Sequence, residues 1–79
     1  MGNNQKGVKN SLLQLKERKE KEGQYGDVKA ACDKVGVTIS VFFKALKKEN
    51  IDSLTTMELE TLTAYKEILD NRAKLKAAL

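Results

Sequence analysis

The stretch Val35–Phe43, VGVTISVFF, decides how this chain folds. Every second residue in it is Val, Ile or Phe, and Gly36, Thr38 and Ser40 lie between the first four, which is the alternation typical of a β-strand. The sequences on either side, DVKAACDK and KALKKEN, have helical patterns instead. Because glycine readily adopts the left-handed conformation that ends a helix, the stretch also fits a sharp turn followed by a second helix.

A strand and a helix make different demands on the rest of the chain. The backbone groups of a strand must be paired, and no other segment of this sequence has a strand pattern. A strand over residues 35–43 would therefore pair only with a second copy, as in a ribbon-helix-helix dimer. A helix satisfies its own backbone, and the helical spacing continues through Lys44 to Lys48. We therefore predict a turn at Gly36 followed by a helix, with the shared ribbon as the alternative.

Length and composition indicate one small folded domain that does not enter a membrane. The chain has 79 residues, of which 41% are apolar and 33% charged, a balance typical of a folded domain with a thin core. Its apolar runs are three residues or shorter, and no apolar segment follows the first charges, so we expect neither a membrane span nor a secretory signal. The single cysteine, Cys32, fits a reducing, cytoplasmic setting and a role as a small packing residue.

The residue types argue against catalysis. The chain has no histidine and one cysteine, which excludes a Cys–His pair, a Ser–His–acid triad and a metal site built from several His and Cys ligands. The acidic residues stand mostly among lysines, as on a solvated helix surface. We therefore expect no enzymatic activity, no cofactor, no metal and no small-molecule substrate.

Positive charge is concentrated in the first two thirds of the chain. The net charge is +4, with fifteen Lys and Arg against eleven Asp and Glu. Residues 1–24 carry +3 and residues 25–50 carry +2, whereas residues 51–79 carry −1. Such an excess suits the phosphate backbone of a nucleic acid or another anionic surface.

Helical spacing of apolar residues runs through most of the chain and predicts an all-α fold. The expected helices form a small bundle in one domain, residues 8–79, which follows a flexible N-terminus, residues 1–7. We place these helices at residues 8–22, 27–35, 38–49 and 55–77.

Polar residues set the expected helix boundaries. The carboxylate of Asp27 is expected to cap the second helix, and Asn50 is expected to end the third. Thr55 and Glu58 have the spacing of a capping box at the start of the last helix. The charged run from Lys16 to Glu22 is interpreted as a solvated helix end.

The segment VKAACDKVGVTISVFFKAL, residues 28–46, resembles a helix-turn-helix DNA-binding motif. The motif has a small residue four places before a glycine at the turn, and Cys32 and Gly36 stand there. Val35 and Val37 supply the apolar residues that flank the glycine, while Phe42 and Ala45 supply the core-facing residues of the second helix. With flanking helices, the chain resembles small phage and plasmid regulators of the lambda-repressor-like kind. The resemblance implies binding of double-stranded DNA and regulation of transcription.

Carried over residue by residue, the motif assigns the groove-facing positions to the third predicted helix. Its polar residues would bond to bases or phosphates, and its later lysines would hold phosphates. No Arg or Asn stands there for two-point recognition of a base, and several of the positions are apolar. The expected DNA-binding residues are Thr38, Ile39, Ser40, Phe43, Lys44, Lys47 and Lys48.

Apolar residues of the last predicted helix exceed what so small a core needs, so we expect a homodimer through that helix. The residues concerned spread over more than one face, and the two recognition helices would then address half-sites about 34 Å apart. A helical protein-interaction module or inhibitor, docking an apolar helix face on a host protein, is the alternative function. The surplus apolar residues are Leu54, Met57, Ala64, Ile68, Leu75 and Leu79.

Overall fold

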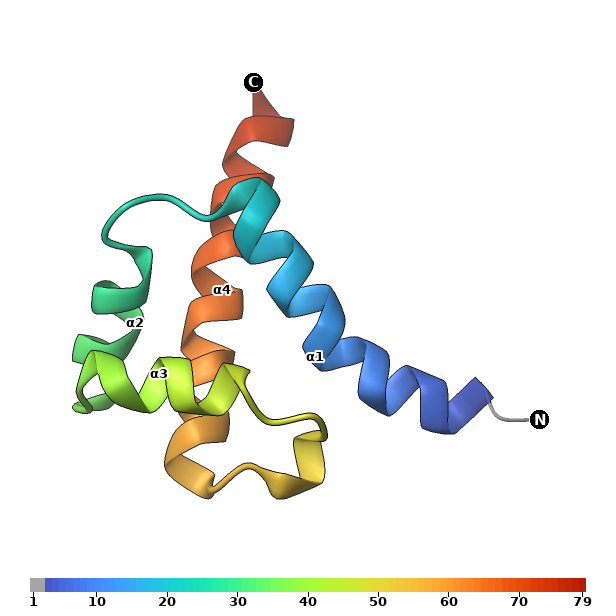
Figure 1. The fold of residues 1–79 in the computed structure, drawn as a ribbon. Helices are drawn as coiled ribbons and strands as arrows, with labels where there is room; N and C mark the ends of the chain where they lie inside the picture. The colour runs from blue at the N-terminus through green and yellow to red at the C-terminus, as the bar shows by residue number, and fades with distance from the viewer. Residues whose placement is uncertain (1–2) are drawn as a thin grey trace.

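The computed structural model describes the backbone of residues 3–79 and the side chains of residues 12–79. Over that range the chain is helical and contains no strand, which confirms the predicted all-α bundle (Figure 1). Four α-helices and one short 3₁₀ helix follow one another along the chain: α1 (Asn3–Glu22), α2 (Asp27–Val35), α3 (Ile39–Leu46), η1 (Ile51–Ser53) and α4 (Thr56–Ala78).

Gly36 forms the corner between α2 and α3. Its φ is 88° and its ψ is 35°, the left-handed conformation predicted from the sequence. The N–H groups of Gly36 and Val37 both donate to the carbonyl oxygen of Cys32, at 2.8 and 3.0 Å, and so close the end of α2. Because Val35–Phe43 forms a helix end, a turn and a helix start, the alternative of a shared β-ribbon is wrong.

Two predicted helix boundaries differ from the observed ones by more than one residue. Helix α1 begins at Asn3, before the expected residue 8. Helix α3 ends at Leu46 rather than at residue 49, because the chain turns there toward η1. Asn50 does not end α3 but caps η1, where its side-chain oxygen accepts from the N–H of Asp52 at 2.9 Å. The 3₁₀ helix has no counterpart in the sequence prediction.

The start of α4 follows the prediction closely. The hydroxyl of Thr55 accepts from the N–H of Glu58 at 3.2 Å, and a Glu58 carboxylate oxygen accepts from the N–H of Thr55 at 2.9 Å. This reciprocal pair is the capping box expected from the spacing of the two residues. It fixes where the longest helix of the bundle begins.

Helix α4 is the centre of the bundle, with α2 and α3 packed on one part of it and α1 and η1 on another (Figure 1). The rings of Phe42 and Tyr65 lie 4.9 Å apart between their centroids and link α3 to α4. Tyr25, in the turn before α2, has a fully exposed side chain. The buried apolar residues are Leu12, Leu15, Ala31, Cys32, Phe42, Ala45, Leu62, Ala64, Tyr65 and Leu69.

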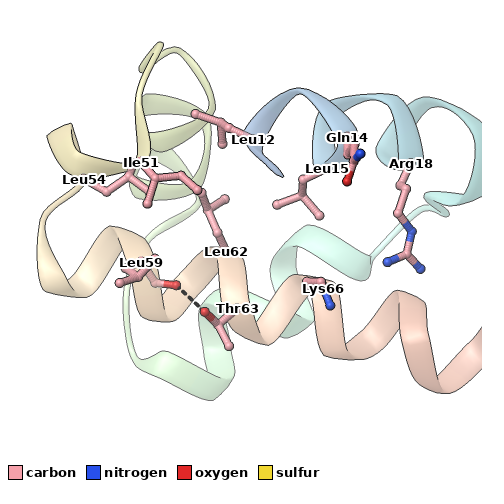
Figure 2. A pocket seen from close by; sticks show the side chains of 10 residues that line it. All are labelled: Leu12, Gln14, Leu15, Arg18, Ile51, Leu54, Leu59, Leu62, Thr63 and Lys66. Carbon is pink, nitrogen blue, oxygen red and sulfur yellow. Dashed lines mark hydrogen bonds between the residues drawn. The ribbon is translucent and has the colours of Figure 1, made fainter. Parts of the chain in front are cut away.

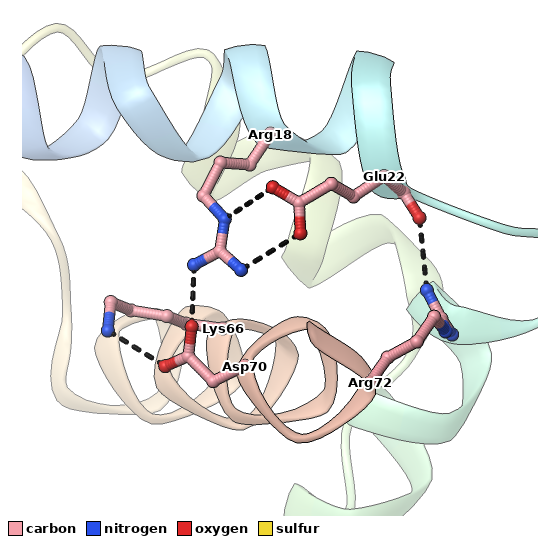
Figure 3. Close-up of polar contacts among 5 residues, drawn as sticks. All are labelled: Arg18, Glu22, Lys66, Asp70 and Arg72. Atoms are coloured by element: carbon pink, nitrogen blue, oxygen red, sulfur yellow. Dashed lines mark hydrogen bonds and ion pairs between the residues drawn. The ribbon is translucent and has the colours of Figure 1, made fainter. Parts of the chain in front are cut away.

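An ionic cluster joins the charged end of α1 to α4 (Figure 3). The guanidinium of Arg18 donates to both carboxylate oxygens of Glu22, at 2.9 and 3.0 Å, and to Asp70 on α4 at 2.7 Å. Lys66 also contacts Asp70, at 3.0 Å. Hydrogen bonds from Arg18 and then from Lys66 lower the pKa of the Asp70 carboxyl. The run interpreted as a solvated helix end therefore also fastens α1 to the bundle.

Asp27 does not cap α2 as predicted. Gly26, with φ of 92°, occupies the N-cap, and Asp27 is the first helical residue. One carboxylate oxygen of Asp27 accepts from the N–H of Gln24 at 2.8 Å, and the other accepts from Arg72 of α4 at 2.6 Å. The carboxylate therefore holds the turn before α2 against α4 rather than satisfying the first N–H groups of the helix.

Candidate nucleic-acid interface

Helix α3 has one buried side and one exposed side. Phe42 and Ala45 are fully buried against the rest of the bundle, and Leu46 is half-buried beside them. Since successive residues of a helix are turned by about 100°, Ser40, Phe43 and Lys44 point away from the buried side. Val41 and Leu46 lie at its edges and are partly buried. The packing of two residues thus fixes which side of α3 faces solvent.

The exposed side of α3 carries six of the seven residues predicted to contact DNA. All six are exposed, and they form one continuous surface along the helix and its N-cap. Thr38 is the N-cap, and its carbonyl oxygen accepts from the N–H of Val41 at 3.1 Å. We call this surface the α3 face; it consists of Thr38, Ile39, Ser40, Phe43, Lys44 and Lys47.

Lys44 and Lys47 supply the positive charge of the α3 face. Neither side chain lies within 4.0 Å of a carboxylate among residues 12–79. Other exposed lysines do have such partners, as in the pairs Lys29–Asp33 and Lys66–Asp70. The charges of Lys44 and Lys47 are therefore not offset by a described carboxylate and are available to an anion.

Lys48, the seventh predicted residue, lies in a different environment. Its Nζ donates to the carbonyl oxygen of Ser53 at 2.9 Å and to a Glu58 carboxylate oxygen at 3.2 Å. The N–H of Thr55, followed by Lys48, lowers the pKa of the Glu58 carboxyl. Lys48 thus ties the segment after α3 to the start of α4. Helical spacing could not indicate this contact, because Lys48 and Glu58 stand ten residues apart and the turn through η1 brings them together.

Phe43 is held in place on the α3 face by contacts on two sides. Its ring meets the buried Phe42 ring edge to face, with centroids 5.3 Å apart and planes at 88°. The Nζ of Lys19, from α1, lies 5.6 Å from the Phe43 centroid, within the range of a cation–π contact. Lys19 is therefore a third cation beside the α3 face. No sequence pattern indicates this contact, because it joins two helices far apart in the chain.

A second surface feature is an apolar groove between α1, η1 and α4 (Figure 2). Its cavity has a volume of about 210 Å³. Arg18 and Lys66 stand at one end, and Leu54 and Leu59 lie toward the other. The side chain of Leu59 is nearly half-exposed there. The lining residues are Leu12, Gln14, Leu15, Arg18, Ile51, Leu54, Leu59, Leu62, Thr63 and Lys66.

The remaining chemistry-bearing groups do not gather into a site in the described part of the chain. Cys32 is buried between the helices, and burial raises the pKa of its thiol. Burial likewise raises the pKa of the Tyr65 hydroxyl. Among residues whose side chains are described, no three His, Cys, Asp or Glu lie close enough to hold a metal ion. The α3 face and the apolar groove are therefore the features from which a function can be argued.

Comparison of the chain with protein-family models, with curated proteins and with solved structures gave no match. Within the described residues, none of the helices has the length and the apolar character needed to cross a bilayer.

Proposed function

We propose that this protein binds double-stranded DNA through the α3 face and acts as a small transcriptional regulator of the phage or plasmid type. The observation that carries the proposal is a joint exposure along one side of α3, opposite the fully buried Phe42 and Ala45. The exposed residues are Thr38, Ile39, Ser40, Phe43, Lys44 and Lys47. A short helix fixed from behind and preceded by a sharp turn is suited to enter the major groove, which is wide enough for an α-helix.

Each kind of side chain on the α3 face has a separate part in the proposed binding. Lys44 and Lys47 neutralise phosphates and release counterions, which supplies affinity for any sequence. The hydroxyls of Thr38 and Ser40, near the N-terminus of α3, hydrogen-bond to base edges or to phosphate oxygens. Binding involves no catalysis, and occupancy of the DNA represses transcription or recruits a further factor.

The direct test is binding to a random-sequence duplex pool over a series of salt concentrations. We expect the logarithm of the binding constant to fall linearly with the logarithm of the salt concentration. Lys44→Ala and Lys47→Ala should each weaken binding and flatten the logarithmic slope by about 0.9, the value for one lost phosphate contact on B-DNA. Fluorescence anisotropy of a labelled duplex measures both quantities.

Lys74→Ala is the matched control for the two lysine variants. Lys74 is also an exposed helical lysine, but it lies near the end of α4, far from α3 in Figure 1. Its removal changes the net charge equally and should leave the salt slope unchanged. Equal slopes for all three variants would show that α3 holds no phosphate and would overturn the proposal.

We propose further that the protein dimerises through α4. Of the surplus apolar residues predicted from the sequence, Met57 and Leu75 of α4 and Leu79 just after it remain exposed in the single chain. Ala64, counted among the surplus residues from the sequence, belongs to the chain's own core and drops out. Sedimentation equilibrium of the natural chain and of Leu75→Lys tests the dimer. The natural chain should have the molar mass of a dimer and the variant that of a monomer.

A protein-interaction module is the second candidate function, and the apolar groove beside Leu59 favours it. For such a module, affinity for duplex DNA should be absent or unspecific, and loss of Lys44 or Lys47 should leave the salt slope unchanged. The salt series therefore separates the two candidates without knowledge of the partner.

A further inference from the structure

We infer that the α3 face recognises A·T base pairs by apolar contact with the C5-methyl groups of thymine, through Ile39 and Phe43. This inference rests on the proposed DNA binding and names the sequence class that the same surface would read. It follows from what the exposed side of α3 contains and from what it lacks.

Ile39 and Phe43 stand one helical turn apart on the exposed side of α3. Their side chains are 44% and 43% exposed, so each presents a large apolar surface to solvent. Covering an exposed apolar group lowers the free energy of the complex. The major-groove edge of B-DNA offers one apolar group for this, the thymine methyl. Spacing by four residues places both side chains on the same surface of the helix.

Polar groups able to read other bases by two-point contact are missing from α3. Guanine is commonly read by a forked Arg and adenine by Asn or Gln, and Ile39–Leu46 contains none of these residues. Lys44 can donate to guanine only as a single point charge. The hydroxyls of Thr38 and Ser40 can bond to either kind of base pair, so discrimination between base pairs falls mainly on the apolar pair.

The surroundings of the apolar pair favour DNA over an apolar protein surface as its partner. Lys44 and Lys47 share the α3 face, and Lys19 lies over the Phe43 ring. Against an apolar partner, these cations would lose their hydration at a cost in free energy. Beside a DNA groove, they would contact phosphates instead. The edge-to-face packing on Phe42 also positions the Phe43 ring before binding, so little side-chain freedom is lost.

Two matched pairs of probes test the inference by changing only the methyl group. The first pair is a duplex of alternating A·T pairs, made with thymine or with uracil. The second is a duplex of alternating G·C pairs, made with cytosine or with 5-methylcytosine, which carries a methyl at the same ring position. We expect replacement of thymine by uracil to weaken binding by about fourfold for each methyl in contact. Replacement of cytosine by 5-methylcytosine adds a methyl and should strengthen binding.

Variants of the chain assign the effect to the two side chains. Ile39→Ala and Phe43→Ala should each reduce the ratio of thymine to uracil affinity, whereas Lys44→Ala should lower both affinities and keep the ratio. Phe43→Leu keeps an apolar side chain if the alanine variant loses its fold, as judged by far-UV circular dichroism, and should retain part of the ratio. Each measurement is made at one low salt concentration.

The possible failures are distinguishable. Equal affinity for the thymine and uracil duplexes, with Lys44 and Lys47 still required, would overturn the thymine inference and leave the proposed DNA binding intact. Absence of binding to any of the four duplexes would overturn both.

Discussion

Asp27 and Arg72 are joined by a hydrogen bond of 2.6 Å between the first residue of α2 and the last third of α4. Both side chains are largely shielded from solvent, with 10% and 22% of their surfaces exposed. The same guanidinium donates to the carbonyl oxygen of Glu22 at 3.0 Å, at the end of α1 (Figure 3). One arginine thus fastens the last residue of α1 and the first of α2 to the central helix.

The Asp27–Arg72 pair predicts a loss of stability in acid. The hydrogen bond from Arg72, supported by the N–H of Gln24, lowers the pKa of Asp27 below its usual value in the folded protein. Stability from this carboxylate is therefore present above the unfolded pKa of about 3.9 and is lost as pH falls through the lower folded pKa. Urea unfolding at pH 7 and at successively lower pH values down to 2 should show this decline.

Asp27→Asn isolates the contribution of this carboxylate. At pH 7 the variant should be less stable by about 1.5 kcal/mol, the effect typical of a hydrogen bond to a charged group, and the difference should vanish at the acid end of the series. Asp33→Asn, on the same helix but at an exposed pair with Lys29, serves as the control and should change stability little. A constant difference at all pH values would contradict the assignment.

Gly36→Ala should destabilise the fold through the backbone alone. A Cβ at this position would meet nothing within 4 Å, but φ is +88°, where side chains other than glycine are strained. The expected cost is about 1–2 kcal/mol of unfolding free energy, and Gly36→Asn should cost less because Asn tolerates this conformation better. Urea denaturation of the three proteins gives the order. An alanine variant as stable as the natural chain would show that the corner does not need glycine.

Gly23→Ala should destabilise the fold by a different route, steric overlap. A Cβ there would overlap the carbonyl oxygen of Lys19 and lie 2.7 Å from the Tyr65 hydroxyl. The carbonyl is part of the α1 backbone and cannot move aside freely, so we expect a loss of about 1–3 kcal/mol, in the range for overpacking. Tyr65→Phe in the same background should recover only the part due to the hydroxyl. Full recovery would show that the α1 backbone yields easily.

Lys48→Met separates a structural lysine from the proposed DNA-binding ones. It removes the donor to Ser53 and Glu58 but keeps an unbranched apolar side chain. We expect a lower melting temperature with no change in the salt slope of duplex binding. Lys44→Met is the counterpart and should change the slope while leaving the melting temperature nearly unaltered. A flattened slope for Lys48→Met would return this lysine to the interface.

Local features of this fold could be predicted from the sequence, whereas links between distant residues could not. The glycine corner at Gly36 and the capping box of Thr55 and Glu58 depend on neighbours along the chain, and both predictions are confirmed. Asp27 looked like a local cap because its preferred partners are the N–H groups just after it. Its actual partner, Arg72, lies 45 residues away, and no spacing rule indicates that distance.

In the candidate site, too, local features could be predicted from the sequence and contacts between distant residues could not. Periodicity along α3 was enough to sort its exposed positions from Phe42 and Ala45, because the helix rotates by a constant angle. Periodicity did not indicate that Lys48 pairs with a carboxylate of α4, or that Lys19 reaches the Phe43 ring from α1. Assignment of a surface lysine to a ligand therefore required knowledge of which acids and rings the fold brings near it.

Phe42 and Ala45 pack α3 onto the bundle from behind, so the residues that stabilise the fold differ from those proposed to bind DNA. Replacing Ile39, Ser40 or Lys44 with other helix-compatible side chains should leave the fold intact. Under the proposed function, the sequence preference of the domain could therefore change one exposed position at a time.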